Sequence, residues 1–149
     1  MSVEENIRLS QAGNKALNDH DVERFVNLHL ESVISTDPQN TEPVKGRQKV
    51  RDGVAPMFKA FPDFRIVSEH TFGSGDWIAE QGIAIGTHKG PLEAPGFPAI
   101  PPTNRPIRLR YSFFAKVDGG KFAETHLYFD QAQMMTQLGL TPQNPPEEE

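Results

Sequence analysis

The chain has 149 residues, enough for one domain with a sizeable core, and its net charge of −5 comes from 15 basic and 20 acidic residues. No basic run is present, which argues against nucleic acid or an anionic membrane as a partner. The absence of cysteine excludes disulfides, thiolate catalysis and thiolate metal sites, and no apolar run approaches the ~20 residues of a membrane span. We therefore expect a soluble, cytoplasmic protein.

The first third of the chain has the apolar period of amphipathic helices. One helix is predicted over residues 3–17 and a second over 22–33, with Asp21 as the N-cap of the second. His29 falls on the apolar stripe of that second helix. A lone histidine in this position is either a satisfied core residue or, because the helix would wall a pocket, a substrate contact.

A third helix is predicted over residues 50–61, where apolar residues recur at i, i+4, i+7, i+8 and i+11. Pro56 lies inside this pattern and predicts a kink or a split into two turns. Phe61 ends the helix, where it is most simply a core residue at the junction with the sheet. The same junction makes it a candidate for substrate binding.

After residue 63 the apolar period changes to that of strands. Turn signals at GSGD and VDGGK favour hairpins, because glycine supplies the positive φ of a tight turn. The four predicted strands cover residues 64–72, 77–88, 106–117 and 122–130.

A loop over residues 89–106 separates the second and third strands and contains 6 of the 13 prolines. A loop of this length in a compact domain is typically a lid or a binding loop. His88, where the loop begins, lies either at the mouth of a pocket beneath the lid or in a hydrogen bond to loop backbone. Arg105 is either an anchor for a substrate carboxylate or ester, or a solvated loop residue.

Helices followed by a strongly bent antiparallel sheet predict an α+β fold in which the sheet wraps around the N-terminal helices. A short helix is predicted over 131–140, and the acidic tail 141–149 is expected to be disordered. We expect a single domain over residues 1–140. No glycine-rich nucleotide loop or βαβ alternation is present, so nothing in the sequence favours a nucleotide-binding fold.

Several stretches together resemble the SnoaL-like polyketide cyclase (ester cyclase) family of the nuclear-transport-factor-2-like superfamily. They occur in the family's order over nearly the whole chain, and the strongest are AFPD, GTHKG, PPT and the ending D-x(6)-QLG. The stretch SVISTDP departs from the family, with Ser32 and Thr36 where Asp and His often stand. The resemblance implies a cone-shaped, cystatin-like α+β barrel with an apolar pocket, a homodimer formed through the sheet, and no cofactor.

Cyclases of this family close a polyketide ring by intramolecular aldol condensation, with a pocket aspartate near the end of the last strand as acid and base. Asp130 matches that position, and the resemblance implies this catalytic role for it. An apolar pocket would raise its pKa and make it a stronger base. The local sequence offers a second role, because Asp130 is placed to cap the helix that begins at Gln131. The two roles are compatible.

Glu124, His126, Tyr128 and Asp130 alternate along the last strand and therefore share one of its faces. About 13 Å separates His126 from Asp130 along a strand, which excludes a direct dyad. We expect a row of polar contacts along an elongated substrate, in which Tyr128 donates a hydrogen bond to an enolate oxygen. His126 is a further candidate catalytic residue and Glu124 a candidate substrate contact; cross-strand packing is the alternative for His126 and Tyr128.

The five histidines are scattered without the spacing of a zinc site, so no metal is expected. The predicted function is a cofactor-independent cyclase or isomerase that acts on an enolisable, mostly apolar small molecule. Two alternatives remain open: a non-catalytic small-molecule-binding protein of the same fold, and a hydrolase or epoxide-opening enzyme that uses the same carboxylate.

Overall fold

The computed structural model describes residues 2–93 and 98–140. The chain begins with helices α1 (Val3–Asn18) and α2 (Val22–Asn27). Both start at a side-chain cap; that of α2 is Asp21, which accepts a hydrogen bond from a backbone N–H of the first turn, as predicted.

The predicted helix over 22–33 is wrong beyond Asn27. Leu28 ends α2, and the chain continues as strand β1 (His29–Thr36), so His29 opens a strand instead of lying on a helix. The run HLESVIST ends in β-branched residues, which favour extended backbone. It pairs along much of its length with residues 122–126, far along the chain, and local apolar spacing cannot reveal such a partner.

Helix α3 (Arg47–Ala60) begins earlier than predicted and is not split by Pro56. The backbone N–H of Phe61 still donates to the carbonyl of Met57 at 2.8 Å, beyond the proline. A proline near the end of a helix removes one hydrogen bond without ending the helix, because the following turns keep theirs.

The four predicted strands are confirmed. Both predicted hairpin turns are present, with Gly75 at φ 57° in the first and Gly119 and Gly120 at φ 58° and 77° in the second. The observed strands are β3 (Arg65–Ser74), β4 (Trp77–Thr87), β5 (Pro106–Asp118) and β6 (Lys121–Phe129).

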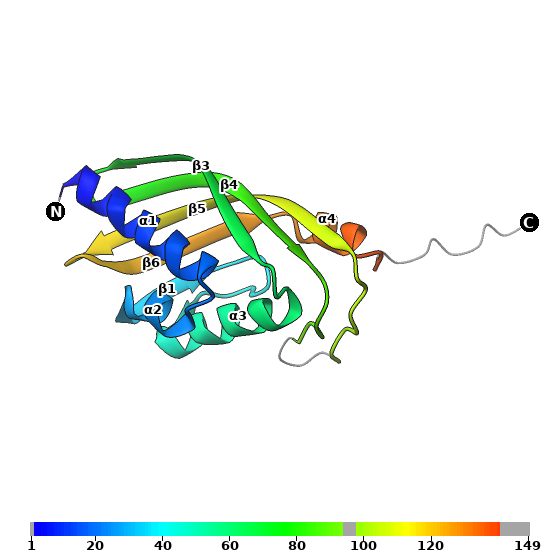
Figure 1. Ribbon diagram of the computed structural model, residues 1–149. Coiled ribbons are helices and arrows are strands. Elements are labelled where there is room, and N and C mark those ends of the chain that lie inside the picture. Colours follow the sequence, from blue (N-terminus) through cyan, green and yellow to red (C-terminus); the bar gives the residue numbers. More distant parts are fainter. Residues whose placement is uncertain (1, 94–97, 141–149) are drawn as a thin grey trace, which may run out of the picture.

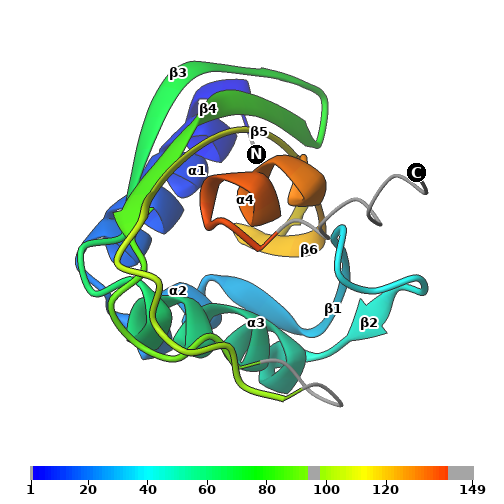
Figure 2. The same cartoon turned by 90° about the vertical axis from the view of Figure 1, so that its right-hand side faces the viewer.

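With β2 (Val44–Lys45), these strands form one sheet in the order β2-β1-β6-β5-β4-β3. Neighbours are antiparallel except β1 and β6, which are parallel. The sheet curls around α1, α2 and α3 (Figure 1). Viewed along the cone, helix α4 (Gln131–Gln137) lies within its opening (Figure 2). This is the predicted α+β cone; we call the side that faces the helices the inner face.

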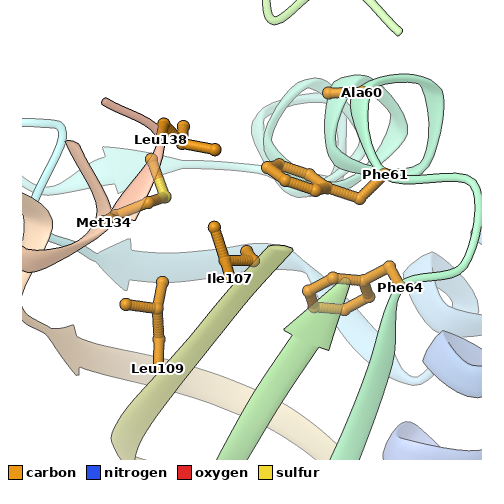
Figure 3. Close-up of a cluster of buried hydrophobic side chains, with 7 residues drawn as sticks. All are labelled: Ala60, Phe61, Phe64, Ile107, Leu109, Met134 and Leu138. Carbon is orange, nitrogen blue, oxygen red and sulfur yellow. The ribbon is translucent and has the colours of Figure 1, made fainter. Parts of the chain in front are cut away.

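Apolar side chains of the inner face form three buried clusters. The cluster beside the hairpin turns contains Leu9, Ile78, Ala115, Val117 and Phe122. The cluster between α2, α3 and β1 contains Val26, Val33 and Val50. The third, which we call the α4-end cluster, contains Ala60, Phe61, Phe64, Ile107, Leu109, Met134 and Leu138 (Figure 3).

The QLG sequence holds α4 against the first residues of β5. The Gln137 side chain accepts a hydrogen bond from the N–H of Arg108 at 2.8 Å and donates one to its carbonyl at 3.0 Å. Leu138 enters the α4-end cluster, and Gly139 ends the helix at φ 75°, a left-handed conformation that suits glycine. The Gln137 amide thus takes the place of a strand partner for Arg108, which lies beyond the last residue of β5 that pairs with β6.

The long loop is fastened at both ends. Leu92 and Ile100 form a backbone bridge, and Lys59 of α3 makes an ion pair with Glu93 at 3.0 Å. Residues 94–97 of the predicted lid and the predicted disordered tail 141–149 lie outside the described residues. Within the described part of the chain, no helix combines the length and apolar character needed to cross a membrane.

Candidate active site

Glu124, His126 and Tyr128 share one face of β6, as predicted, but it is the outer face of the sheet. His126 stands opposite Phe114 of β5, whereas the inner-facing neighbour Phe113 packs into the cluster beside the hairpin turns. The Tyr128 side chain is 56% exposed. Alternation alone identifies residues that share a face, but it does not say which face the helices cover.

His126 is surrounded by outer-face groups. Its Nδ1 lies 2.7 Å from the hydroxyl of Thr36, and its Nε2 lies 3.5 Å from a carboxylate oxygen of Glu124. Its ring stacks beside Trp77. A shallow hollow of about 500 Å³ is lined by Trp77, Phe114, His126 and Tyr128. These side chains are therefore separated by the sheet from the α4-end cluster.

Asp130 caps helix α4, so the capping role that the local sequence offered for it is confirmed. Its Oδ1 accepts a hydrogen bond from the N–H of Gln133 at 3.0 Å, and its side chain is exposed. Phe129 before it and Met134 after it both pack into the α4-end region. Asp130 thus stands at the rim of the apolar cluster and does not line a closed pocket, and its catalytic role stays a prediction.

The inner face carries a buried carboxylate that sequence analysis missed. Glu80 is 4% exposed. Its Oε1 accepts hydrogen bonds from Ser10 at 3.0 Å, Asn14 at 2.8 Å and Thr71 at 3.2 Å, and its Oε2 accepts one from the Tyr111 hydroxyl at 2.8 Å. Burial and the neighbouring Glu80 charge raise the pKa of Tyr111. Because both oxygens are satisfied, this network fastens α1 to the sheet and has no free group for chemistry.

A sequence signal for this network exists in WIAEQGIAIG. Glu80 stands in the alternating register of Ile78, which is buried, so the pattern places a carboxylate on the apolar face of a strand. Gly82, next in that register, leaves room for the Tyr111 hydroxyl, which would lie 2.6 Å from a Cβ at that position.

His29 lies in the core, far along the sheet from α4. It is 2% exposed, and its Nδ1 donates to the carbonyl of Phe25 at 2.8 Å. Its ring packs between those of Phe25 and Phe122. Burial lowers the pKa of His29 to about 4. These are the surroundings of a satisfied core histidine.

The motifs AFPD, GTHKG, PPT and QLG, far apart in the sequence, meet at the α4 end of the cone. Asp63 accepts hydrogen bonds from the N–H of Thr87 at 2.7 Å and from its hydroxyl at 2.9 Å. The N–H of His88 donates to the carbonyl of Arg105 at 3.0 Å. The Arg105 guanidinium in turn lies beside Gly139.

Three predicted substrate-binding residues therefore lie near one another. His88 is 0% exposed, and its ring centroid is 5.5 Å from that of Phe61. Phe61 is itself buried and points toward the residues of α4 and β5 in the α4-end cluster (Figure 3). Arg105 is exposed. The predicted hydrogen bond between His88 and the loop is confirmed, because Nδ1 of His88 bonds to Thr103.

Across residues 2–93 and 98–140, no group of three or more histidine and acidic side chains is arranged to hold a metal ion.

Comparison with known proteins identifies both the family and the fold. The model of the SnoaL-like polyketide cyclase family matches residues 7–138. AclR, a proposed hydroxylase from Streptomyces galilaeus, superposes with a TM-score of 0.80 at 21% identity over 97% of this chain and 87% of AclR. IdmH, a proposed polyketide cyclase from Streptomyces antibioticus, gives 0.71 at 23% identity over 90% and 98%. No curated protein sequence matches the chain.

A third structure, of a proposed SnoaL-like polyketide cyclase from Jannaschia sp. CCS1, gives a TM-score of 0.80 at 19% identity over 94% of this chain and 95% of that one. At such identities these likenesses show the fold alone. The different reactions proposed for AclR and IdmH agree with a fold that accommodates more than one chemistry.

The core position of His29 predicts a pH-dependent loss of stability. The folded state binds the proton with a pKa of about 4, against 6.5 for an exposed histidine, so the unfolded state takes up the proton first as the pH falls. The stability contributed by neutral His29 is present above pH 6.5 and is lost between about pH 6.5 and 4, by about 3 kcal/mol.

Chemical denaturation at several pH values measures this loss. The variant His29→Gln should be less stable at neutral pH, and the difference in unfolding free energy between it and wild type should shrink as the pH falls to 4. A constant difference from pH 7 to 4 would contradict the burial of a neutral imidazole.

Proposed function

The chain belongs to the SnoaL-like polyketide cyclase family, and we propose that it is a cofactor-independent cyclase that acts by acid–base catalysis on an enolisable small molecule. The observation that carries this proposal is the meeting of four distant motifs around the apolar α4-end cluster. A planar, mostly apolar molecule suits that lining, because polar groups there are few and fixed in direction. A polyketide chain with alternating carbonyl groups has this character.

Asp130 is our candidate for the general base. Its Oδ1 is used in capping, whereas among the described residues no hydrogen bond or ion pair engages Oδ2. A free carboxylate oxygen at the rim of an apolar cluster can remove the acidic proton between two carbonyl groups of a substrate that enters the cluster. The resulting enolate carbon attacks a ketone carbon of the same molecule, and the new alkoxide takes the proton back. This ring closure needs no oxidant, metal or co-reactant.

A second candidate function is small-molecule binding without catalysis. The exposure of Asp130 favours it, because a carboxylate in contact with water gains no basicity from desolvation. Epoxide opening and hydrolysis would both need a water molecule held beside the Asp130 carboxylate, whose one hydrogen bond among the described residues is the helix cap to Gln133.

We also propose that a second copy of the chain covers the outer face of the sheet. The row Phe72, Ala79, Phe114, His126 and Thr36 crosses five strands in register on this face. Among the described residues, four aromatic side chains of the outer face are substantially exposed: Phe72 63%, Trp77 41%, Phe114 41% and Tyr128 56%. An exposed aromatic surface of this kind marks an interaction site, and the family resemblance implies that its occupant is a second copy.

Proton exchange tests the catalytic proposal. With 1-phenylbutane-1,3-dione in D₂O, the protein should accelerate loss of the central C–H signal above the buffer rate, as followed by ¹H NMR. Asp130→Asn should lower that acceleration at least 100-fold, because removal of a general base typically costs about 10²–10⁴ in rate. Asn caps helices as well as Asp does, so α4 should keep its cap.

The matched control is Asp21→Asn, which replaces the capping aspartate of α2. Its exchange rate should equal that of wild type. Undiminished exchange in Asp130→Asn would remove Asp130 as the base. Binding of the dione with no accelerated exchange in wild type would favour the non-catalytic function.

The assembly proposal predicts a dimer whose formation depends on the outer face. Light scattering coupled to size exclusion should give twice the chain mass for wild type and the single mass for Phe114→Glu, since the variant would place an unpaired carboxylate within the proposed apolar interface. Lys49→Glu, an exposed charge reversal on α3, is the control and should remain dimeric. A monomeric wild type, or a dimeric Phe114→Glu, would contradict the proposal.

A further inference from the structure

His88 is a buried histidine with one ring nitrogen that has no partner. It is 0% exposed, and no group of the described chain forms a hydrogen bond with its Nε2. The residue continues the alternation of β4 in which Ile78 and Glu80 face inward, so its ring also points to the inner side. Unpartnered buried nitrogens are uncommon, and each one needs an explanation.

The hydrogen bonds of the other nitrogen determine where the proton sits. The backbone N–H of Thr103 lies 3.2 Å from Nδ1, and the Thr103 hydroxyl oxygen lies 3.0 Å from it. A backbone N–H can only donate, so Nδ1 of His88 is an acceptor. The hydroxyl proton is also free to donate to Nδ1, because the Thr103 oxygen accepts from the N–H of Arg105. The single proton of the neutral ring therefore lies on Nε2.

The surroundings keep this ring neutral. Burial lowers the pKa of His88, and the nearby carbonyl of Gly90 opposes the shift only in part. That carbonyl does not meet the distance and angle of a hydrogen bond to Nε2. The nearest aromatic neighbour is Phe61 of the α4-end cluster. His88 thus presents an N–H donor of fixed direction beside the Phe61 ring, buried from water.

We propose that the N–H of His88 at Nε2 is the hydrogen-bond donor for a carbonyl oxygen of the substrate. The inference rests on the proposed function for the location of the substrate at the α4 end and, in its last step, for proton removal by Asp130. It specifies the substrate class as planar ketones and 1,3-diketones. Their carbonyl oxygen can accept one hydrogen bond while the apolar parts of the molecule lie on either side of it. When Asp130 removes the adjacent proton, negative charge moves onto that oxygen, and the same hydrogen bond strengthens.

Thr103 acts as a positioning residue in this arrangement. Its backbone N–H fixes which nitrogen of His88 carries the proton, and the PPT segment holds that N–H in place through the hydrogen bond between the N–H of Asn104 and the carbonyl of His88 at 2.8 Å. The PPT and GTHKG motifs therefore form one unit that presents a donor of fixed direction.

The first measurement is ¹H–¹⁵N NMR of the wild-type chain labelled with ¹⁵N-histidine. The His88 ring should be neutral with its proton on Nε2, and addition of 1-phenylbutane-1,3-dione should move that proton's resonance downfield. Butylbenzene, a hydrocarbon of similar shape without oxygen, should leave the resonance in place. A proton on Nδ1, or a bound dione that leaves the Nε2 proton unmoved, would overturn the inference.

The second measurement compares affinities by calorimetry. Wild type should bind the dione at least tenfold more tightly than butylbenzene, and His88→Phe should remove about that factor, the equivalent of one well-placed hydrogen bond. His70→Phe, which replaces a histidine of the outer face, is the matched control and should bind as wild type does. Amide spectra of each variant establish that it is folded, and the tautomer measurement stands without any variant.

The outcomes separate this inference from the proposed function. Dione binding with a shifted His88 proton but without C–H exchange would support the inference and contradict the cyclase. Accelerated exchange that is unchanged in His88→Phe would contradict the inference and leave the cyclase standing. Failure of the dione to bind at all would contradict both.

Discussion

The curled sheet encloses apolar residues at the end where α4 lies, and the covering of that end is the constraint on which the rest of the structure depends. Helix α4 supplies the cover with Met134 and Leu138, while Phe61 and Phe64 reach the same space from the α3 junction. Burial of such side chains contributes about 1.5–3 kcal/mol each, so the cover and the cone stabilise one another. Any ligand at this end must therefore share space with groups that hold the fold together.

The two faces of the sheet carry different kinds of side chain. Its inner face contains satisfied polar groups, such as Glu80, and the His88 ring nitrogen Nε2, which has no hydrogen-bond partner among the described residues. Its outer face carries exposed aromatic side chains and the His126–Glu124 pair. In our proposals the small molecule therefore binds on the inside, and a second copy of the chain covers the outside.

Helices α1, α3 and α4 and the last four strands with their hairpin turns could be predicted from the sequence, because apolar periods and glycine turns are local signals. The cone shape was implied by the family resemblance. The strand at His29 could not be predicted, since its partner β6 lies some ninety residues away in the chain. The sequence also could not predict which face of the sheet carries His126 and Tyr128, because the alternation of side chains is the same for inward and outward orientations. The His88 tautomer depends on Thr103, whose position follows only from the folded loop.

We propose above that the small molecule lies inside the cone at the α4 end. Intermolecular NOEs between 1-phenylbutane-1,3-dione and methyl-labelled protein test it most directly. Our account predicts contacts from the phenyl ring to the methyl groups of Ile107, Met134 and Leu138. Contacts to the outer-face ring of Trp77, with none to those methyl groups, would contradict it.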